Sequence, residues 1–376
     1  MSAGTEARRE RLSRRALSRA TLERQHLVRR ADGESALTMV RHLYGLQAQA
    51  PMAPYFALWA RLKGFRPADL STLIEDRDVV RIVLMRGTVH AVTAADALEL
   101  RPWVQPIMDG DLRTNPQHKD ALVGVDVGAV ADWSRETIDR TPMSMAALRP
   151  LLAQRWPDRD SAALAHAVRD LLPLVQVPPR GIWGRSGQPV CTTLERWTAS
   201  PLSAPAPDEV ILRYLAAYGP ASVLDAQAWS GLTRLGEIFE RLRPRLRVFV
   251  DEDGAELFDL PDAPRPDPAG SLPPRILAPF DSVLLGHANR SRVIADEHRK
   301  VVFTVNGIIK PTVLVGGLVA GFVTVTEKKG AATVEIATFA PPAKSVASSL
   351  EAEARRLLRF AHPGAENHDV RFTAAR

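Results

Sequence analysis

The chain has 376 residues, of which 45% are hydrophobic and 24% are charged, a balance that is ordinary for a globular protein and excludes a fibrous or wholly disordered one. Lys and Arg number 49 against 43 Asp and Glu, giving a net charge of +6, which favours a polyanionic partner. The single cysteine, Cys191, excludes an intramolecular disulfide and a metal site built from several cysteines.

The first thirty residues are strongly basic, with nine arginines and three glutamates. Two interpretations stay open for this segment: a solvated basic helix, or an arm that contacts phosphate groups through residues such as Arg14 and Arg15. The segment has no apolar stretch of the kind found in secretion signals, so we expect a cytoplasmic protein.

Two glutamines follow the next predicted helix, in the motif GLQAQAP at residues 45–51. The preceding residues have the apolar spacing of a core-facing helix, and Gly45 is a plausible helix stop. Pro51 biases the residue before it towards an extended backbone. If residues 46–50 are extended, Gln47 and Gln49 project to the same side. The sequence therefore predicts two amide side chains aimed at one point.

One order of elements recurs along the chain: helices followed by a β-hairpin. The most complete copy spans residues 208–261, where three helical stretches precede two alternating runs around a Glu-Asp-Gly turn. A looser copy runs from 143 to 197 with a turn at Ser186 and Gly187, and a first copy begins near Thr21 and ends in a hairpin that turns at Arg86 and Gly87. Helices with a β-hairpin wing form the winged-helix plan, so we predict three winged helices in tandem.

The C-terminal part is rich in β-branched residues. The pairs Asn306–Gly307 and Gly316–Gly317 predict two hairpins in succession, the first of which begins with a strand at 301–305. A further strand at 333–340 and a terminal helix at 349–361 follow, which we interpret as a small antiparallel sheet closed by a helix. The apolar run within this part is too short and too rich in glycine for a membrane span, so we expect no membrane contact.

Taken together, these patterns predict an α+β fold in four units. Proline-rich stretches at 201–207 and 260–274 read as connectors between units. The predicted units are residues 1–135, which carry the basic helix and the two glutamines, residues 139–200 and 207–262 as the second and third winged helices, and residues 271–376 as the β-rich region.

Common nucleotide-binding and hydrolase motifs are absent from the sequence, including phosphate-binding loops, HExxH and G-x-S-x-G. We therefore predict no cofactor and no metal. Basic residues do stand at the predicted wings and turns, where DNA-binding proteins place phosphate contacts. These candidate contacts are Arg86, His90, Arg180, Arg185, Arg290 and Arg292.

Several of these segments resemble a known family. LSRRALSRATLERQ, GLQAQ, LMRGTVHAVTAADA, GIWGRSG, and FDSVLLGHANRSRVI followed by NGIIKPTVLV are similar to the AlkZ/YcaQ family of bacterial DNA glycosylases, in the same order and over nearly the whole chain. The resemblance implies three tandem winged helices and a β-rich tail, arranged as a C around a basic channel for duplex DNA. It also implies a monomer in the nucleoid.

The family's activity is the release of bulky N7-alkylguanines and the unhooking of interstrand cross-links made by alkylating natural products, as self-resistance to them. Its catalytic motif is glutamine–aliphatic–glutamine, or glutamine–x–aspartate in the other branch. Gln47-Ala48-Gln49 is similar to the first branch, so the resemblance assigns catalysis to Gln47 and Gln49. We hypothesise that the two amides position a water molecule, because alkylation at N7 already makes guanine a good leaving group.

Two other functions remain open from the sequence. A non-catalytic winged-helix protein such as a transcriptional regulator would bind one preferred operator, although no dimerisation helix is recognisable. A protein that sequesters the alkylating drug would leave alkylated DNA intact.

Overall fold

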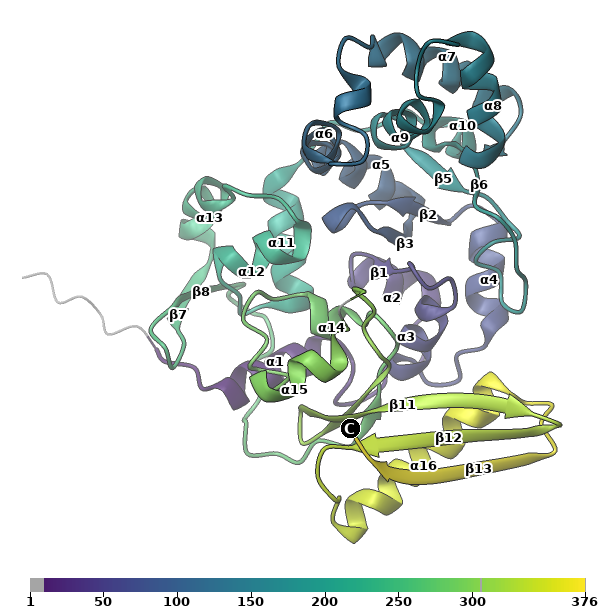
Figure 1. Cartoon of the computed structure of the whole chain (residues 1–376). Coiled ribbons are helices and arrows are strands. Elements are labelled where there is room, and N and C mark those ends of the chain that lie inside the picture. The colour runs from purple at the N-terminus through teal and green to yellow at the C-terminus, as the bar shows by residue number, and fades with distance from the viewer. Residues whose placement is uncertain (1–9, 305, 376) are drawn as a thin grey trace, which may run out of the picture.

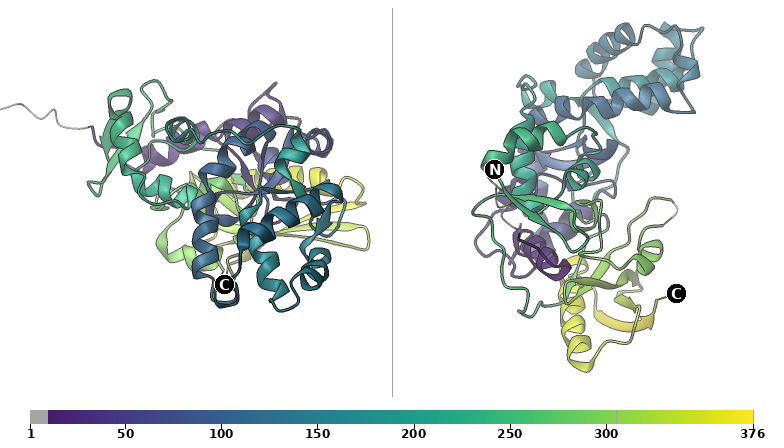
Figure 2. Two further views of the ribbon diagram at one scale, coloured as in Figure 1. Left: turned by 90° about the horizontal axis from the view of Figure 1, so that it is seen from above. Right: turned by 90° about the vertical axis from the view of Figure 1, so that its left-hand side faces the viewer.

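The computed structural model describes residues 10–304 and 306–375. Helices and strands are mixed along the chain, so the predicted α+β class is confirmed. Figure 1 shows β1–β3 near the centre, with α6–α10 above them, α11–α13 to one side and the C-terminal sheet below. Seen from the side in Figure 2, the helices around α7 and α8 and the C-terminal sheet lie at opposite ends of the molecule.

The basic N-terminal segment forms one helix, α1 (Arg14–Arg24), whose first turn is capped by the Ser13 side chain. The chain before it pairs with the third predicted unit, because Leu12 N–H donates to the Val250 carbonyl at 2.8 Å. Leu17 packs with Phe249 in the same small cluster. The basic helix is thus docked on the protein over its apolar side.

The first predicted unit contains the hairpin expected at Arg86 and Gly87. Helix α2 ends before the predicted stop, and both Tyr44 (φ 56°) and Gly45 (φ 104°) adopt the left-handed conformation that turns the chain into β1. The elements are α2 (Ala36–His42), β1 (Leu46–Gln47), α3 (Ala53–Arg61), α4 (Pro67–Glu75), β2 (Val79–Val83), the 3-10 turn η1 (Met85–Gly87) and β3 (Val89–Thr93).

The second predicted unit shares a sheet with the first. Ile82 of β2 pairs with Val175 of β5, which joins the two hairpins in one six-stranded sheet of order β1-β3-β2-β5-β6-β4. The predicted turn at Ser186 and Gly187 lies in the long connection between β5 and β6. The first predicted unit also contains α5 (Ala94–Trp103), α6 (Gln105–Thr114), η2 (Asp120–Leu122) and most of α7 (Val127–Arg140). The elements of the second are β4 (Met143–Ser144), α8 (Met145–Arg155), α9 (Ser161–Leu171), β5 (Leu174–Gln176), β6 (Val190–Thr193) and α10 (Leu194–Thr198).

The third predicted unit has three helices and a hairpin in the expected order. Its Ser222 caps the second helix in a reciprocal capping box with Asp225. The elements are α11 (Pro207–Tyr218), α12 (Val223–Ser230), α13 (Gly236–Leu242), η3 (Arg243–Arg245), β7 (Arg247–Val250) and β8 (Glu256–Asp259). The boundaries of the four predicted units, and their description as winged helices, stay predictions.

The C-terminal region is a five-stranded sheet of order β13-β12-β11-β10-β9, with α16 packed against it. The hairpin at Gly316–Gly317 and the strand at 333–340 are found as β10–β11 and β12. The elements are β9 (Arg275–Ile276), α14 (Ser282–Leu285), α15 (Asp296–Val302), β10 (Thr312–Val315), β11 (Leu318–Lys328), β12 (Ala331–Thr338), α16 (Lys344–Ala361) and β13 (Asn367–Ala374).

Two expectations about this region are wrong. The start of the strand expected at 301–305 belongs to α15, which has acidic residues in its first turn and basic residues in its last, as the helix dipole favours; position 305 lies outside the described residues. The predicted terminal helix is not the last element, because β13 follows it and pairs in parallel with β12. The sheet is therefore mixed rather than antiparallel.

The predicted units share their cores. One apolar cluster joins α2–α4 to the C-terminal sheet and α16, and a second joins the β2–β3 hairpin to α11–α13. Within the part of the chain that the structure describes, the search for helices long and apolar enough to cross a membrane gave none.

Candidate active site

Gln47 lies in β1, and Gln49 follows it at a bend, so the extended run that we expected over residues 46–50 holds only as far as Ala48. β1 pairs antiparallel with β3, with Gln47 opposite His90, and Ala48 N–H continues the pairing by donating to the Val89 carbonyl at 2.7 Å. Leu46 and Ala48 are buried, whereas Gln47 is half-buried and Gln49 is exposed. Both amides are thus turned away from the core.

The residue between the glutamines is held by a buried arginine. Arg81 Nη2 on the neighbouring strand β2 donates to the Ala48 carbonyl at 3.1 Å and to Gln176 Oε1 at 3.2 Å. Burial away from water, with a smaller contribution from the charge of Arg180, lowers the pKa of Arg81 to about 10. These partners are neutral oxygens, so Arg81 fixes the motif's backbone without a carboxylate to offset its charge.

The segment GIWG supports this arginine. Gly181 has φ +91°, and a Cβ there would stand 2.3 Å from Arg81 Cδ. The Tyr55 hydroxyl donates to the Gly181 carbonyl at 2.7 Å, which holds the segment in place. A glycine is therefore required at 181, both by the backbone conformation and by the space that Arg81 occupies.

A second arginine, which is half-buried, contacts the first glutamine directly. Arg86, in the tight turn between β2 and β3, has φ 57°. Its Nη2 donates to Gln47 Oε1 at 2.8 Å, and its Nη1 donates to the Trp229 carbonyl on α12. Burial lowers the pKa of Arg86 to about 10. Arg86 thus joins the hairpin turn, β1 and the third predicted unit.

The end of α12 closes over this turn. Gly231, at φ +86°, follows α12, and a Cβ there would lie 2.9 Å from Arg86 Cα and 3.1 Å from the Ile107 side chain of α6. The close approach leaves no room for a side chain at 231 and seats the third predicted unit against the turn that carries Arg86.

His90 completes the cluster around Gln47 as a neutral side chain. Its Nδ1–H donates to the Thr88 carbonyl at 2.9 Å, so its Nε2 faces Arg86 Nη2, 3.5 Å away, as an acceptor. Burial, reinforced by the charge of Arg86, lowers the pKa of His90 to about 3. His90 is therefore uncharged near neutral pH and cannot act as an acid there.

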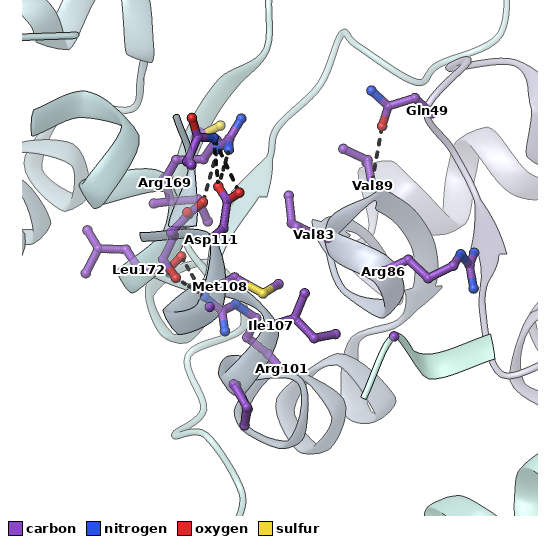
Figure 3. A pocket seen from close by; sticks show the side chains of 18 of the residues that line it. Gln49, Val83, Arg86, Val89, Arg101, Ile107, Met108, Asp111, Arg169 and Leu172 are labelled. Atoms are coloured by element: carbon purple, nitrogen blue, oxygen red, sulfur yellow. Dashed lines mark hydrogen bonds and ion pairs between the residues drawn. The ribbon is translucent and has the colours of Figure 1, made fainter. Parts of the chain in front are cut away.

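The second glutamine stands at the edge of a cleft of about 880 Å³. Gln49 Oε1 accepts a long hydrogen bond, 3.4 Å, from Val89 N–H. Figure 3 shows Gln49 and Arg86 on one side of the cleft and Asp111 and Arg169 on the other. The arginines that line the cleft are Arg86, Arg101, Arg169 and Arg180, and its apolar wall includes Val83, Ile107, Met108, Leu172 and Leu174.

Comparisons with known proteins show which family the chain belongs to. A family model described as DNA glycosylase AlkZ-like matches residues 40–360, most of the chain. The chain belongs to the AlkZ-like DNA glycosylase family. Membership makes it a DNA glycosylase and confirms the resemblance inferred from the sequence.

Two individual relatives agree with this family assignment. The AlkZ-like chain is 26% identical over 324 residues to a protein named interstrand DNA cross-link repair glycosylase from Streptomyces sahachiroi, a match that covers 80% of this chain and 84% of that protein. It also has the fold of the solved Streptomyces sahachiroi DNA glycosylase AlkZ, with a TM-score of 0.80 and 22% identity, over 96% of this chain and 100% of that one.

Three of the predicted DNA contacts of this AlkZ-like glycosylase lie at or near the cleft. Arg86 and Arg180 line it, and Arg180 Nη1 donates to the Gly187 carbonyl at 2.7 Å in the long β5–β6 connection. Arg185 is exposed on the same connection. His90, by contrast, is buried beneath Arg86 and offers no surface to a phosphate.

The remaining predicted DNA contacts come from parts of the sequence far from Gln47 and Gln49. Arg14 and Arg15 are exposed on α1, where Arg14 Nη2 lies 3.4 Å from Asp253 Oδ2. Arg290 is half-buried over the Phe303 ring. Arg292 disagrees with its predicted role: it is 4% exposed, donates to the Pro220 carbonyl at 2.8 Å and pairs with the Asp225 carboxylate. Such burial makes it a structural residue.

Sequence reasoning missed two residues that hold the glutamine motif and its surroundings in place, Arg81 and Gly231. Arg81 carries a recognisable signal, because it is a charged residue in the middle of the apolar strand VVRIV, and buried charges are rare without a specific partner. Gly231 carries no signal beyond being a glycine after a helix, since the close approach that requires it comes from a distant part of the chain.

A second polar cluster on the cleft wall was also missed. The side chains of Asp111, His166 and Asp170 meet within 4.8 Å of one another, the spacing of metal ligands. Arg169 Nη2 lies 3.2 Å from His166 Nδ1, which places the imidazole proton on Nε2, facing Asp111 Oδ2 at 2.9 Å. With Nε2 protonated, His166 is a donor rather than a metal ligand. Burial raises the pKa of Asp170 to about 7.

Proposed function

We propose that this glycosylase hydrolyses the N-glycosidic bond of cationic N7-alkylguanines in duplex DNA, including guanines joined in an interstrand cross-link. The observation that carries the proposal is the pair of glutamines at the end of β1, with Gln47 held by Arg86 and Gln49 at the edge of a cleft lined by arginines. The related protein from Streptomyces sahachiroi is named for cross-link repair, which supports the larger substrates and a role in resistance to an alkylating natural product.

The chemistry of the two glutamines fits a cationic leaving group. Alkylation at N7 gives guanine a positive charge, so the departing base needs no proton from an acid. The two amides are hydrogen-bonded to Arg86 and to the main chain of Val89, and neither partner is an acid. Water attacks C1′ while the C1′–N9 bond breaks, the bond's electron pair neutralises the purine, and the proton that the attacking water loses passes to the surrounding solvent. An amide can orient that water but cannot take its proton at neutral pH.

The cleft also suits a substrate that cannot be extracted from the helix. A cross-linked guanine stays tied to the opposite strand, so it cannot enter a closed pocket of the kind that most base-flipping enzymes use. Cleft-lining arginines such as Arg169 and Arg180, together with Arg185, would contact the phosphates of an intact duplex. One chain supplies all of these residues, in agreement with a monomer.

The proposal is tested by incubating the protein with three duplexes: one with 7-methylguanine, one without modification, and one with a nitrogen-mustard cross-link between guanines. We expect release of 7-methylguanine, loss of the cross-linked species on a denaturing gel, and no release of unmodified bases. Tight binding of one preferred sequence without release from either damaged duplex would instead favour a regulator.

A further inference from the structure

The two glutamines of the motif are not equivalent, and the difference lies in what holds their oxygens. A guanidinium has only donor groups, so the Gln47 amide must turn its oxygen, not its nitrogen, towards Arg86 Nη2 at 2.8 Å. The Gln47 oxygen is therefore engaged by a charged donor, and the free end of this amide is its Nε2H₂ group.

Gln49 is held much more weakly. Its oxygen accepts only the main-chain N–H of Val89, at 3.4 Å, which is the long limit for such a bond. The side chain is exposed at the edge of the cleft. A charged, short hydrogen bond draws electron density from the oxygen that accepts it, whereas a long bond from a neutral donor draws little. The Gln49 oxygen is the better acceptor of the pair.

We propose that Arg86 is a positioning residue that divides the work between the two glutamines: Gln47 donates hydrogen bonds through Nε2 to the substrate, and the Gln49 oxygen accepts a hydrogen bond from the attacking water. The inference rests on the proposed function and concerns the same site. Arg86 acts through Gln47, because its guanidinium is bound on the protein side by the Trp229 carbonyl and His90 Nε2.

The surroundings of Arg86 show that this orientation is built in. Gly231 leaves no room for the turn to move away from β1, and His90 presents an acceptor because its other ring nitrogen is committed to Thr88. The arginine is thus surrounded by acceptors on three separate elements: β1, β3 and α12. These acceptors fix the conformation of the Arg86 side chain, and Arg86 in turn fixes the orientation of the Gln47 amide.

Two isosteric substitutions separate donor from acceptor. In Gln47→Glu the new carboxylate pairs with Arg86, but the Nε2 donors are lost, so we expect the single-turnover release of 7-methylguanine to fall about 100-fold, as for removal of a transition-state donor. In Gln49→Glu an acceptor oxygen remains, so the rate falls by less than about tenfold at neutral pH. It falls further as the pH drops through the carboxylate's pKa, a profile that a merely structural role would not produce.

Arg86→Gln tests the positioning role itself, and Arg77→Gln is its matched control. Arg77 is also a left-handed arginine in a turn, and it also donates to a tryptophan carbonyl, that of Trp197, at 3.1 Å. We expect Arg86→Gln to slow release about 30-fold at saturating protein and Arg77→Gln to leave the rate unchanged, with folding checked by thermal denaturation.

Each of these experiments has an outcome that would overturn a specific claim. Equal losses in the two glutamate variants, or a greater loss in Gln49→Glu, would overturn the division of work, and the Gln47→Glu variant decides this even if Arg86→Gln does not fold. Equal rates for Arg86→Gln and Arg77→Gln would overturn the positioning role. Absence of release by the unaltered protein, on 7-methylguanine and on the cross-link alike, would overturn the proposed function, which is a different result from either.

Discussion

Buried arginines occur in two regions of this glycosylase, and they have opposite partners. Where α1, α3 and α14 meet the third predicted unit, Arg24 pairs with Asp259 and Arg61 pairs with Asp281, each at 2.7 Å and fully buried. Beneath β1, Arg81 and Arg86 are bound by carbonyl and amide oxygens. Arg61 and Asp281 form a neutral pair, and Asp259 is shared between Arg24 and Arg265, so each buried arginine at this junction has a carboxylate partner. Arg81 and Arg86 keep their charge.

The difference shows what each region is for. A buried cation without a carboxylate costs free energy, which is why burial lowers the pKa of Arg81 and Arg86 to about 10. Such charge strengthens the positive potential of a cleft that binds a polyanion, in the case of Arg81 without direct contact, because that side chain is only 2% exposed. The predictions that follow test this contrast, beginning with the largest expected effect.

Asp281→Ala should destabilise the protein by about 3–5 kcal/mol, because it leaves Arg61 as an unpaired charge in the junction and also removes the cap of α14. Chemical denaturation measures the loss. Asp296→Ala, which breaks the exposed pair with Arg299, is the control and should change stability by less than about 0.5 kcal/mol. Similar losses in the two variants would contradict the structural role of the junction.

Arg81→Met, in contrast, should reduce the rate of base release more than it reduces stability. Stability should fall by only about 1–2 kcal/mol, because the variant loses hydrogen bonds but also removes a buried charge. Release of 7-methylguanine should slow about tenfold or more, because the Ala48 carbonyl between the glutamines is no longer held. An unchanged rate would show that Arg81 does not support the motif.

Buried histidines in both regions contribute to the pH dependence of stability, in the direction opposite to Asp170, whose pKa is raised to about 7 by burial; comparison with His90→Gln isolates the contribution of His90. Burial lowers the pKa of His90, at the site, and of His287, beside Asp225 and Arg292, from the ordinary 6.5 to about 3. Below pH 6.5 the unfolded chain takes up protons that the folded chain refuses, so stability should fall as the pH drops from 6.5 towards 3, by at most about 1.4 kcal/mol per pH unit for each histidine.

Denaturation at several pH values between 7.5 and 4.5 measures this slope, and His90→Gln should reduce it. The release rate of the folded enzyme should show no step attributable to His90 in that range. A step near pH 6.5 that disappears in His90→Gln would mean that His90 titrates in the folded protein, contrary to its burial.

The smallest effect concerns the exposed arginines. Arg185→Ala should weaken duplex binding and reduce the salt dependence of log K by about one unit. Arg14→Ala should do less, because Arg14 lies beside Glu252 and Asp253, which already offset its charge. Binding titrations at several salt concentrations separate the two. A larger change for Arg14 would place the duplex along α1 rather than along the cleft.

The local features of this fold were predictable where the sequence carries a local signal. The alternation of burial from Leu46 to Gln49 agrees with the predicted pattern, although the strand itself ends at Gln47 and the chain bends at Gln49. The hairpins at Arg86–Gly87 and Gly316–Gly317 follow from their turn residues. The family resemblance rested on the same short segments.

The failures share one physical cause, which is contact between distant parts of the chain. The pairing of β2 with β5, the return of β13 to β12 and the burial of Arg292 depend on tertiary packing that no local pattern reports. Arg292 and Arg185 look alike in sequence, as arginines beside predicted turns. Only the structure separates them, because one meets Asp225 in the core and the other meets solvent.

The most direct test of the central claim is single-turnover release of 7-methylguanine from duplex DNA by the unaltered protein, Gln47→Ala and Gln49→Ala, at protein concentrations that saturate the DNA. The account predicts release by the unaltered protein and a loss of about 100-fold or more in each variant, with duplex binding retained. Release that survives both substitutions would show that the chemistry lies elsewhere and would contradict the account.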